Sequence, residues 1–304
     1  MVLLTKYTLL YGTVLMLVAL GGMFSERSGI INIALEGIMV IGGLAGVLVT
    51  SAVGPASPVM QVILSILTAA LAGMIYSLLL AFASINLKAD QTIGGTALNI
   101  LATAIAMVIA KRVNGSEAAR IKYVNSAFMF NIGQVTINWF FVLGIVILAI
   151  SFLILYKTKL GLRLRACGEH PQAADSVGIN VYKMRYIGVL FSGALGGIGG
   201  FAYIVPAVSD WDFANGVTGM GFLALAVMIF GQWQPIRIFL AALFFSVFKS
   251  LANIADSTFL AALKWPKEIY NMMPFIASTI VLALTSGKSR APKAEGIPYD
   301  KGQR

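Results

Sequence analysis

Nine long apolar stretches are the feature of this sequence that most restricts its fold. They cover approximately residues 8–24, 30–52, 60–85, 94–111, 136–156, 184–208, 219–231, 236–256 and 268–286. A helix that crosses a bilayer needs about 20 mostly apolar residues, whereas a membrane β-strand shows alternation over roughly ten. We therefore expect an all-α polytopic membrane protein with about nine transmembrane spans. The stretch 219–231 is the shortest, so it is the weakest as a full span.

The chain has too few charged residues to cover a water-exposed surface. It is 59% hydrophobic and 11% charged, whereas about a quarter of the residues of a typical soluble domain are charged. This composition excludes a cytosolic enzyme, a disordered chain and a nucleic-acid-binding module, and it indicates a surface in contact with membrane lipid. Because Cys167 and His170 are the single cysteine and histidine, the chain alone forms no disulfide and no His/Cys metal site. We expect no cofactor.

The distribution of Lys and Arg indicates the orientation in the membrane. With the 157–183 loop placed in the cytoplasm, fourteen basic residues fall on the inside and seven on the outside, which is the bias expected of cytoplasmic loops. The sequence thus predicts an external N-terminus, one transmembrane domain over 1–286 and a basic, solvated cytoplasmic tail over 287–304. The first stretch has no upstream basic cluster and no small-residue cleavage site, so we interpret it as a retained span.

Two segments of similar sequence suggest an inverted repeat. The segment 29–42 begins Gly-Ile-Ile-Asn-Ile-Ala-Leu and ends Ile-Gly, and the segment 221–231 begins Gly-Phe-Leu-Ala-Leu and ends Phe-Gly. In the predicted topology the first copy runs outward and the second inward, which is a common plan for a transporter with a central site. A chance similarity between two segments rich in small and aliphatic residues explains the pattern equally well.

Polar residues in the second and fourth stretches are candidates for a substrate path. Asn32 and Glu36 are four residues apart on one helical face, and Thr96 and Asn99 are three apart. A charge that faces lipid at mid-depth costs at least about 2.5 kcal/mol, so such groups pair with each other or line a protein cavity. Residues 28–29, Ser-Gly, can break the helix before them and leave a half-helix. The alternative for all four residues is packing, in which they only hydrogen-bond neighbouring helices.

The 157–183 loop differs from an ordinary connection between spans. It is amphipathic and mixed in charge, and its Gly168, Pro171 and Gly178 predict a short helix with Glu169 at its start. The small residue Ala174 would let this helix lie close to a partner. A short helix that projects from a membrane bundle indicates docking to another protein, although a simple connector accounts for it equally well.

Two glycine-containing motifs have simple interpretations. Gly193 and Gly197, like Gly196 and Gly200, have the spacing that lets two helix backbones approach closely, so they predict packing rather than nucleotide binding. The segment 286–289, Ser-Gly-Lys-Ser, lacks the earlier glycine and the preceding strand of a phosphate-binding loop. The sequence therefore contains no ATP site that we can identify.

Three motifs together resemble the permease subunits of ABC importers. They are the stretch 25–37, the run 159–180 and the segment 221–235, in this order and at these spacings. The resemblance extends from about residue 12 to residue 299. Within these permeases the sequence is most similar to the branch for nucleosides, a sister of the simple-sugar and branched-chain amino-acid branches. It implies a fold like that of type II ABC importers.

The resemblance assigns the 166–180 segment to the contact with the ATPase. The positions that match the family's coupling segment are Gly168, Glu169, Pro171, Ala174 and Gly178. The family also implies two ABC ATPase subunits, a second and often non-identical permease subunit, and an extracellular or periplasmic substrate-binding protein, assembled in the lipid of the bacterial cytoplasmic membrane. Family members often carry an arginine near the position of Met220, so no ligand-handling role is transferred to that residue.

The resulting expectation is a transport subunit that is not an enzyme. The chain would translocate nucleosides while a partner subunit hydrolyses ATP. One alternative is a simple-sugar or branched-chain amino-acid ABC permease. Another, from a different class, is an ion-coupled secondary transporter, for which Glu36 is the plausible coupling carboxylate. A membrane-embedded enzyme is disfavoured because the single His and Cys lie in one predicted cytoplasmic loop.

Overall fold

The chain folds mainly into helices. The computed structural model describes residues 2–55, 57–132, 135–255, 266–285 and 290–302. The α-helices of the described residues are α1 (Val2–Arg27), α2 (Leu35–Val53), α3 (Pro58–Ala81), which continues into a π-helical turn (Phe82–Asn86), α4 (Gln91–Asn114), α5 (Trp139–Lys157), α6 (Lys159–Glu169), α7 (Pro171–Ser176), α8 (Val181–Ile204), α9 (Met220–Phe230), α10 (Pro235–Asn253) and α11 (Lys267–Thr285).

Each of the nine apolar stretches coincides with one helix. Seven helices are long and apolar enough to cross a membrane, namely α1, α2, α3 with its π-helical turn, α4, α5, α8 and α10. Helix α9 has only 11 residues, so it spans about 16 Å, roughly half of a bilayer core of about 30 Å. The all-α polytopic fold is therefore confirmed, while the total of nine crossings stays a prediction.

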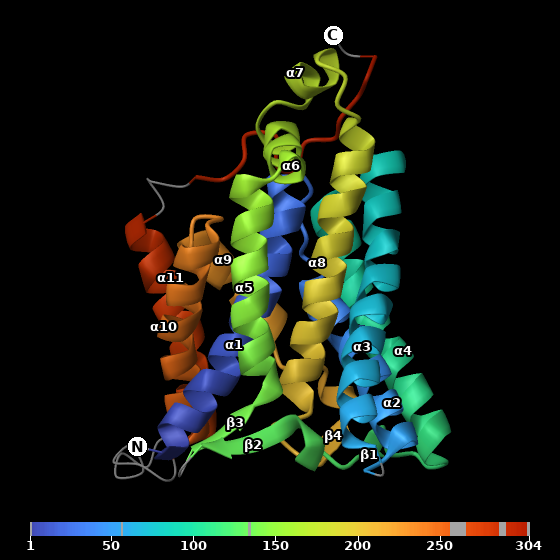
Figure 1. Ribbon diagram of the computed structural model, residues 1–304, viewed down its shortest axis with the longest axis vertical. Helices are drawn as coiled ribbons and strands as arrows, with labels where there is room; N and C mark the ends of the chain where they lie inside the picture. Colours follow the sequence, from blue (N-terminus) through green and yellow to red (C-terminus); the bar gives the residue numbers. More distant parts are fainter. Residues whose placement is uncertain (1, 56, 133–134, 256–265, 286–289, 303–304) are drawn as a thin grey trace.

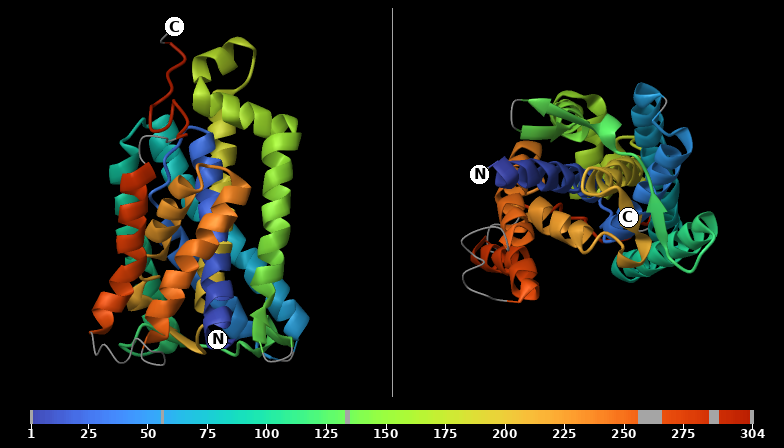
Figure 2. Two further views of the ribbon diagram at one scale, coloured as in Figure 1. Left: turned by 90° about the vertical axis from the view of Figure 1, so that its left-hand side faces the viewer. Right: turned by 90° about the horizontal axis from the view of Figure 1, so that it is seen from below.

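Helices α1 and α8 form the centre of the bundle. They pack against each other, α8 also packs against α2 and α3, and α1 packs against α10. Seen from below, α10 and α11 lie on one side of this centre and α3 and α4 on the other (Figure 2). Helices α3, α4 and α5 leave most of their surface uncovered within this chain, as expected of helices that face lipid or another subunit.

Glycines of α8 allow the close helix contacts, as the sequence predicted. A Cβ atom on Gly197 would overlap the carbonyl of Ala69 in α3, and one on Gly200 would overlap the carbonyl of Met39 in α2. The packing interpretation of these motifs is confirmed, because any side chain larger than hydrogen would push the helices apart.

Two small antiparallel sheets, which the sequence analysis did not predict, lie at the end of the bundle that holds the N-terminus (Figure 1). Strand β1 (Arg120–Lys122) pairs with β4 (Asp210–Asp212), and β2 (Met129–Ile132) pairs with β3 (Val135–Asn138). The carboxylates of β4 also lie within 3.8 Å of the Arg120 guanidinium. The β1–β4 sheet thus ties the loops before α5 and α9 together, and the β2–β3 sheet lies within the loop before α5.

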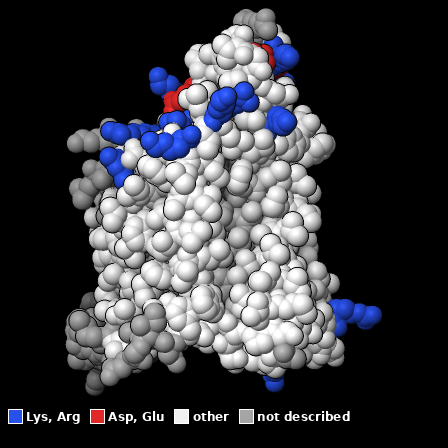
Figure 3. All heavy atoms as spheres, viewed as in Figure 1, with Lys and Arg blue, Asp and Glu red and all other residues white. Residues whose placement is uncertain are grey.

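The two ends of the bundle differ in charge. Helices α6 and α7 and the C-terminus lie at the end opposite the sheets (Figure 1). On the face shown in Figure 3, most Lys and Arg side chains gather at this same end. The predicted cytoplasmic segments therefore share one end of the molecule, as the predicted orientation requires.

The C-terminal tail corrects one expectation. We expected the tail to be solvated, but residues 290–302, here called the C-terminal strap, fold back onto the bundle. The backbone N–H of Ala294 donates a 2.8 Å hydrogen bond to the carbonyl of Gly168, and the Tyr299 side chain is 4% exposed. An exposed ion pair of 2.7 Å joins Asp300 to Lys88. Burial of apolar side chains such as that of Tyr299 favours the folded-back arrangement. The net positive charge of the tail had indicated a solvated segment instead.

Candidate functional site

An irregular segment, residues 28–34, separates α1 from α2 inside the bundle. We call this interruption of the helical structure the break. Gly29 has a φ of 100°, a conformation that glycine adopts without strain. The Ser25 hydroxyl donates to the carbonyl of Ile30 at 2.7 Å, and the side-chain oxygen of Gln91 accepts the Ile31 N–H at 2.7 Å. These side chains satisfy backbone groups that no helix pairs, which an irregular segment at membrane depth requires.

Asn99 of α4 holds the other end of this break. Its Oδ1 accepts the backbone N–H of Gly37 at 2.7 Å, and its Nδ2 donates to the carbonyl of Ile33 at 2.9 Å. Asn99 therefore fixes the start of α2, and both polar groups of its amide are used in doing so.

Glu36 joins the starts of two helices. Its two carboxylate oxygens accept the backbone N–H groups of Gly219 and Gly221, at 2.7 and 2.6 Å. Gly219 is the N-cap residue of α9, so the carboxylate binds the positive end of the helix dipole. From this point α2 continues toward the sheets and α9 toward the end with α6 and α7 (Figure 1). The two segments thus run in opposite directions, as predicted for an inverted repeat.

Asn32 lies in the same break and is fully buried. Its Nδ2 donates to the Ser192 hydroxyl of α8 at 2.7 Å. Its Oδ1 has no hydrogen-bond partner among the residues that the structure describes. A buried carbonyl without a donor is costly, so Asn32 carries free acceptor capacity that Asn99 lacks.

Thr96 does not join this group. Its side chain is exposed, and its hydroxyl donates to the carbonyl of Thr92 one turn earlier in α4, at 2.8 Å. Although Thr96 and Asn99 are three residues apart, their side chains do not share a surface, because Thr96 faces out of the chain and Asn99 faces the start of α2. Three of the four candidate residues meet at the break, and Thr96 lies outside it.

Lys249 of α10 is a residue that the sequence analysis did not single out. Its ammonium is attracted by the Glu36 carboxylate, although no ion pair within 4.0 Å joins the two. Tyr203 of α8, whose hydroxyl lies 2.7 Å from that of Thr218, also interacts electrostatically with Glu36. The signal was present in the sequence, because Lys249 stands well inside the apolar stretch 236–256.

The end of α1 is tied to two other elements. The indole Nε1 of Trp233 donates to the Glu26 carboxylate at 2.6 Å, and the Arg27 guanidinium donates to the Trp233 carbonyl at 3.2 Å. Arg27 also lies 3.6 Å from the Glu169 carboxylate at the end of α6. These contacts connect the break after α1 with both the turn before α10 and the 157–183 loop.

The 157–183 loop forms two helices rather than one. Pro171 begins α7 as predicted, but Glu169 is the last residue of α6, and His170 is the N-cap residue of α7. The expectation that Glu169 starts the helix is therefore wrong, because its carboxylate turns back toward Arg27. Gly178, with a φ of 83°, lies two residues beyond the end of α7.

Two of the expected coupling residues face inward. A Cβ atom on Gly168 would overlap the carbonyl of Arg27, and Ala174 packs in a buried cluster with Cys167, Val181 and Tyr299. Larger side chains at 168 and 174 would therefore disturb this chain itself before they disturbed a partner. Burial raises the pKa of the Cys167 thiol to about 11.

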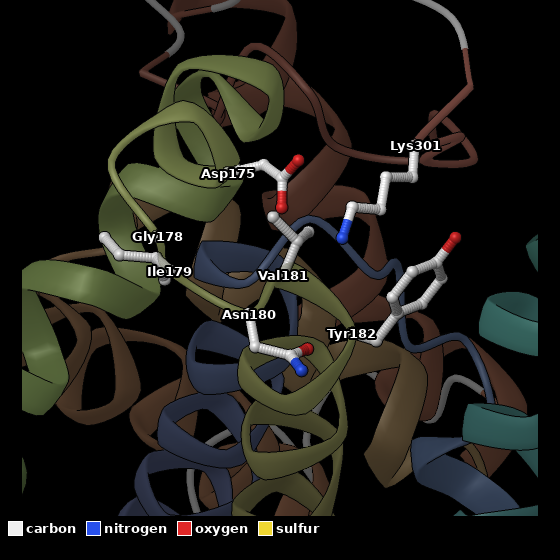
Figure 4. A pocket seen from close by; sticks show the side chains of 7 residues that line it. All are labelled: Asp175, Gly178, Ile179, Asn180, Val181, Tyr182 and Lys301. Atoms are coloured by element: carbon white, nitrogen blue, oxygen red, sulfur yellow. The ribbon is translucent and has the colours of Figure 1, made fainter.

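The outward face of α7 consists of other residues. Gln172, Ala173 and Ser176 are exposed, and the Val177 side chain after the helix is 75% exposed. Beside them is a hollow of about 350 Å³, lined by Asp175, Gly178, Ile179, Asn180, Val181, Tyr182 and Lys301. In Figure 4 the side chains of Asp175 and Lys301 reach this hollow from α7 and from the C-terminal strap. Val177 gives this surface an apolar tip.

Comparisons with known proteins place the chain in a family. The family model described as "Branched-chain amino acid transport system / permease component" matches residues 4–283. The chain is 41% identical to the guanosine ABC transporter permease protein NupQ of Bacillus subtilis, over 98% of this chain and 96% of that protein. It is also 41% identical to the nucleoside ABC transporter permease protein NupC of Lactococcus lactis, over 97% and 96% of the two chains.

A second permease of the same Lactococcus lactis strain is a more distant relative. The nucleoside ABC transporter permease protein NupB is 27% identical over 63% of this chain and 54% of that protein. No solved structure matches the chain. The match over nearly the whole chain, with the helical bundle above, identifies this multi-pass membrane protein as a member of the branched-chain amino acid transport system permease component family.

Proposed function

We propose that this chain is the translocation subunit of an ATP-driven nucleoside importer. The observation that carries the proposal is the 41% identity to two nucleoside ABC permeases over nearly the full length of each. Relatives of such length and similarity usually share a substrate class, and a helical bundle with a broken helix pair at its centre is suited to alternating access. In this proposal the chain itself is not an enzyme, and a partner ATPase hydrolyses ATP.

The proposed substrate path passes the break between α1 and α2. Glu36 and Asn32 are its central residues. The Glu36 carboxylate joins the starts of α2 and α9, and the Asn32 side-chain oxygen has no hydrogen-bond donor among the described residues. Lys249 of α10 adds a positive charge that interacts electrostatically with Glu36. Asn99 supports the path by fixing α2, and Thr96 contributes only where its exposed face meets a second subunit.

The proposed partners follow from the same relatives. Lactococcus lactis has two nucleoside permeases that resemble this chain to different degrees, which supports a pair of non-identical permease subunits. The largely uncovered faces of α3, α4 and α5 offer surface for such a neighbour. The exposed side of α7 would contact an ABC ATPase, and an external binding protein would deliver the nucleoside at the end with the sheets.

Transport by the reconstituted complex tests this function. The chain is placed in proteoliposomes with a second permease, an ABC ATPase and a binding protein from the same organism, and uptake of radiolabelled guanosine, adenosine, uridine, glucose and leucine is measured. We expect nucleoside uptake that needs ATP inside and the binding protein outside, and that ionophores leave unchanged. Uptake that follows an ion gradient without ATP would contradict the proposal, as would ATP-driven uptake of leucine or glucose alone.

A variant of Glu36 tests the path separately. Glu36→Gln keeps the shape of the side chain but removes its charge and one of its two acceptor oxygens. We expect a changed transport rate or nucleoside preference with a normal amount of assembled complex. Unchanged transport in both Glu36→Gln and Asn32→Ala would return these residues to a packing role.

A further inference from the structure

The C-terminal strap contacts four separate parts of the bundle. The N–H of Ala294 binds the carbonyl of Gly168 at 2.8 Å, and the N–H of Gly296 binds the carbonyl of Gly29 at 3.2 Å. Tyr299 lies at the start of α8, where its ring is 5.4 Å from that of Tyr182. The next residue of the strap, Asp300, forms an ion pair with Lys88 in the loop before α4. A tail that served only as an end of the chain would not need these contacts.

Tyr299 completes the core of the 157–183 loop. The buried cluster of this loop contains Cys167, Ala174, Val181, Met184 and Tyr299. Four of these residues come from α6, α7 and α8, and the fifth comes from the strap. Helix α7 has six residues, of which Pro171 and Ala174 are buried, and Ala174 packs in this cluster. A displacement of α7 must therefore displace the Tyr299 ring or open the cluster.

The other end of the strap rests on the break after α1. Gly296 has a φ of 74°, and a Cβ atom there would lie 2.8 Å from the side chain of Ile31. Within the strap, the N–H of Glu295 binds the carbonyl of Pro292, and the N–H of Ile297 binds that of Ala294. These turns keep residues 292–297 compact, and Tyr299 follows only three residues after Gly296.

The break connects the strap to the candidate site. It contains Asn32 and is followed by Glu36 in the first turn of α2, whose carboxylate binds the start of α9. Side-chain packing thus joins α7 to Tyr299, the strap backbone leads from Tyr299 to Gly296, and Gly296 contacts the break that precedes Glu36. From this arrangement we propose that the C-terminal strap is a positioning element that couples the movement of α6 and α7 to the break that controls the substrate path.

This inference rests on the proposed function only in requiring a transporter driven through α7. It assigns a role to residues outside the three motifs that carried the family resemblance. It also explains why the strap is ordered by backbone hydrogen bonds to both Gly168 and Gly29, which are the two ends of the connection. A passive cover would protect the bundle from water without linking these two points.

The test measures coupling rather than stability. In the reconstituted complex, ATP hydrolysis is measured with and without the nucleoside-loaded binding protein, and nucleosides transported per ATP are counted. For Tyr299→Ala we expect about a tenfold loss of stimulated hydrolysis and a lower transport ratio, because the strap no longer follows α7. Tyr299→Phe keeps the ring and should restore both. Ile297→Ala changes an exposed strap residue and should behave like the natural chain.

A second variant covers the case in which Tyr299→Ala does not assemble. Gly296→Ala loosens the contact with the break by strain at a positive φ and by contact with the flexible end of Ile31, and it leaves the Tyr299 cluster intact. We expect reduced coupling at a normal amount of assembled complex. A normal transport ratio in Gly296→Ala or in assembled Tyr299→Ala would overturn the inference. Failure of the natural complex to import nucleosides would instead reject the proposed substrate, and coupling would still be measured with the substrate it does import.

Discussion

The side-chain oxygen of Asn99 accepts the backbone N–H of Gly37 at 2.7 Å, and this bond fixes the point at which α2 begins. The same side chain binds the carbonyl of Ile33 on the other side of the break. Asn99 thus replaces the hydrogen bonds that a continuous helix would have made. Its amide acts as a structural bridge between α4 and the break.

Replacing Asn99 by leucine should destabilise the protein. Asn99→Leu keeps a similar volume but leaves the Gly37 N–H and the Ile33 carbonyl without their partner, and each unpaired buried group costs about 1–3 kcal/mol. We expect a clear drop in the apparent melting temperature of the protein in detergent. Thr96→Val is the matched control one turn earlier, because the Thr96 hydroxyl binds only its own helix. Equal melting temperatures for the two variants would contradict the bridging role.

Removing the charge of Lys249 should impair transport rather than assembly. The ammonium has no ion-pair partner within 4.0 Å among the described residues but is attracted by Glu36, so methionine in its place removes a buried positive charge that acts on Glu36 and relieves the desolvation cost of that charge. We expect Lys249→Met to lower the nucleoside transport rate about tenfold, which corresponds to about 1.4 kcal/mol in the transport barrier, with a normal amount of complex. Lys249→Arg should retain part of the rate.

The control for this charge removal is Lys111→Met. Lys111 lies in the last turn of α4 and pairs at 3.2 Å with the exposed Glu117, so its loss should leave uptake unchanged. Full transport by Lys249→Met would show that this lysine serves only to balance Glu36.

The native cysteine should resist alkylation. Cys167 is 0% exposed, and burial raises the pKa of its thiol to about 11. Since the thiolate is the reactive form, only about one molecule in a thousand is reactive at pH 8. Iodoacetamide labelling of the folded protein should therefore be slow and should rise with pH toward 11, and unfolding in detergent should make it fast. Rapid labelling at pH 7 would contradict the packing of this loop.

Because Cys167 is the single cysteine, a cysteine introduced elsewhere can test the orientation in the membrane. On a Cys167→Ser background, Lys293→Cys places a thiol on an exposed position of the strap. We expect an impermeant maleimide to label it in inside-out vesicles and to leave it unlabelled in intact cells. Labelling in intact cells would reverse the predicted topology.

The helices could be predicted from sequence because a bilayer demands long apolar segments. The half-length of α9 was visible as the shortest stretch, and the packing role of Gly197 followed from its spacing alone. The beginning of α2 at Leu35 rather than at residue 30 was not visible, because the residues of the break are mostly apolar. Their backbone groups are satisfied by Gln91 and Asn99, which lie about 60 residues away in the chain.

The site was predictable in its residues more than in their roles. Glu36 was found because a carboxylate in an apolar stretch is costly, but its partners Gly219 and Gly221 have no polar side chain that a pattern could reveal. The strap was missed for a related reason. Its contacts to the bundle include backbone hydrogen bonds, one tyrosine ring and an exposed ion pair, whereas its composition is that of a solvated tail.

The outward face of α7 should bind the ATPase, and Val177 is the residue that tests it. This side chain is 75% exposed at the tip of the loop, and burying a valine in a partner's groove contributes about 2 kcal/mol. Val177→Asp should therefore weaken binding of the ATPase subunit roughly thirtyfold without unfolding the bundle, which is measured by titrating the ATPase onto the permease pair in nanodiscs. Val124→Asp makes the same change at an exposed valine two residues after β1 and should leave binding intact. Ala174→Trp, by contrast, should lower the melting temperature, because Ala174 lies in the buried cluster with Tyr299. Normal ATPase binding and normal stimulated turnover in Val177→Asp would show that α7 is only a connector between α6 and α8.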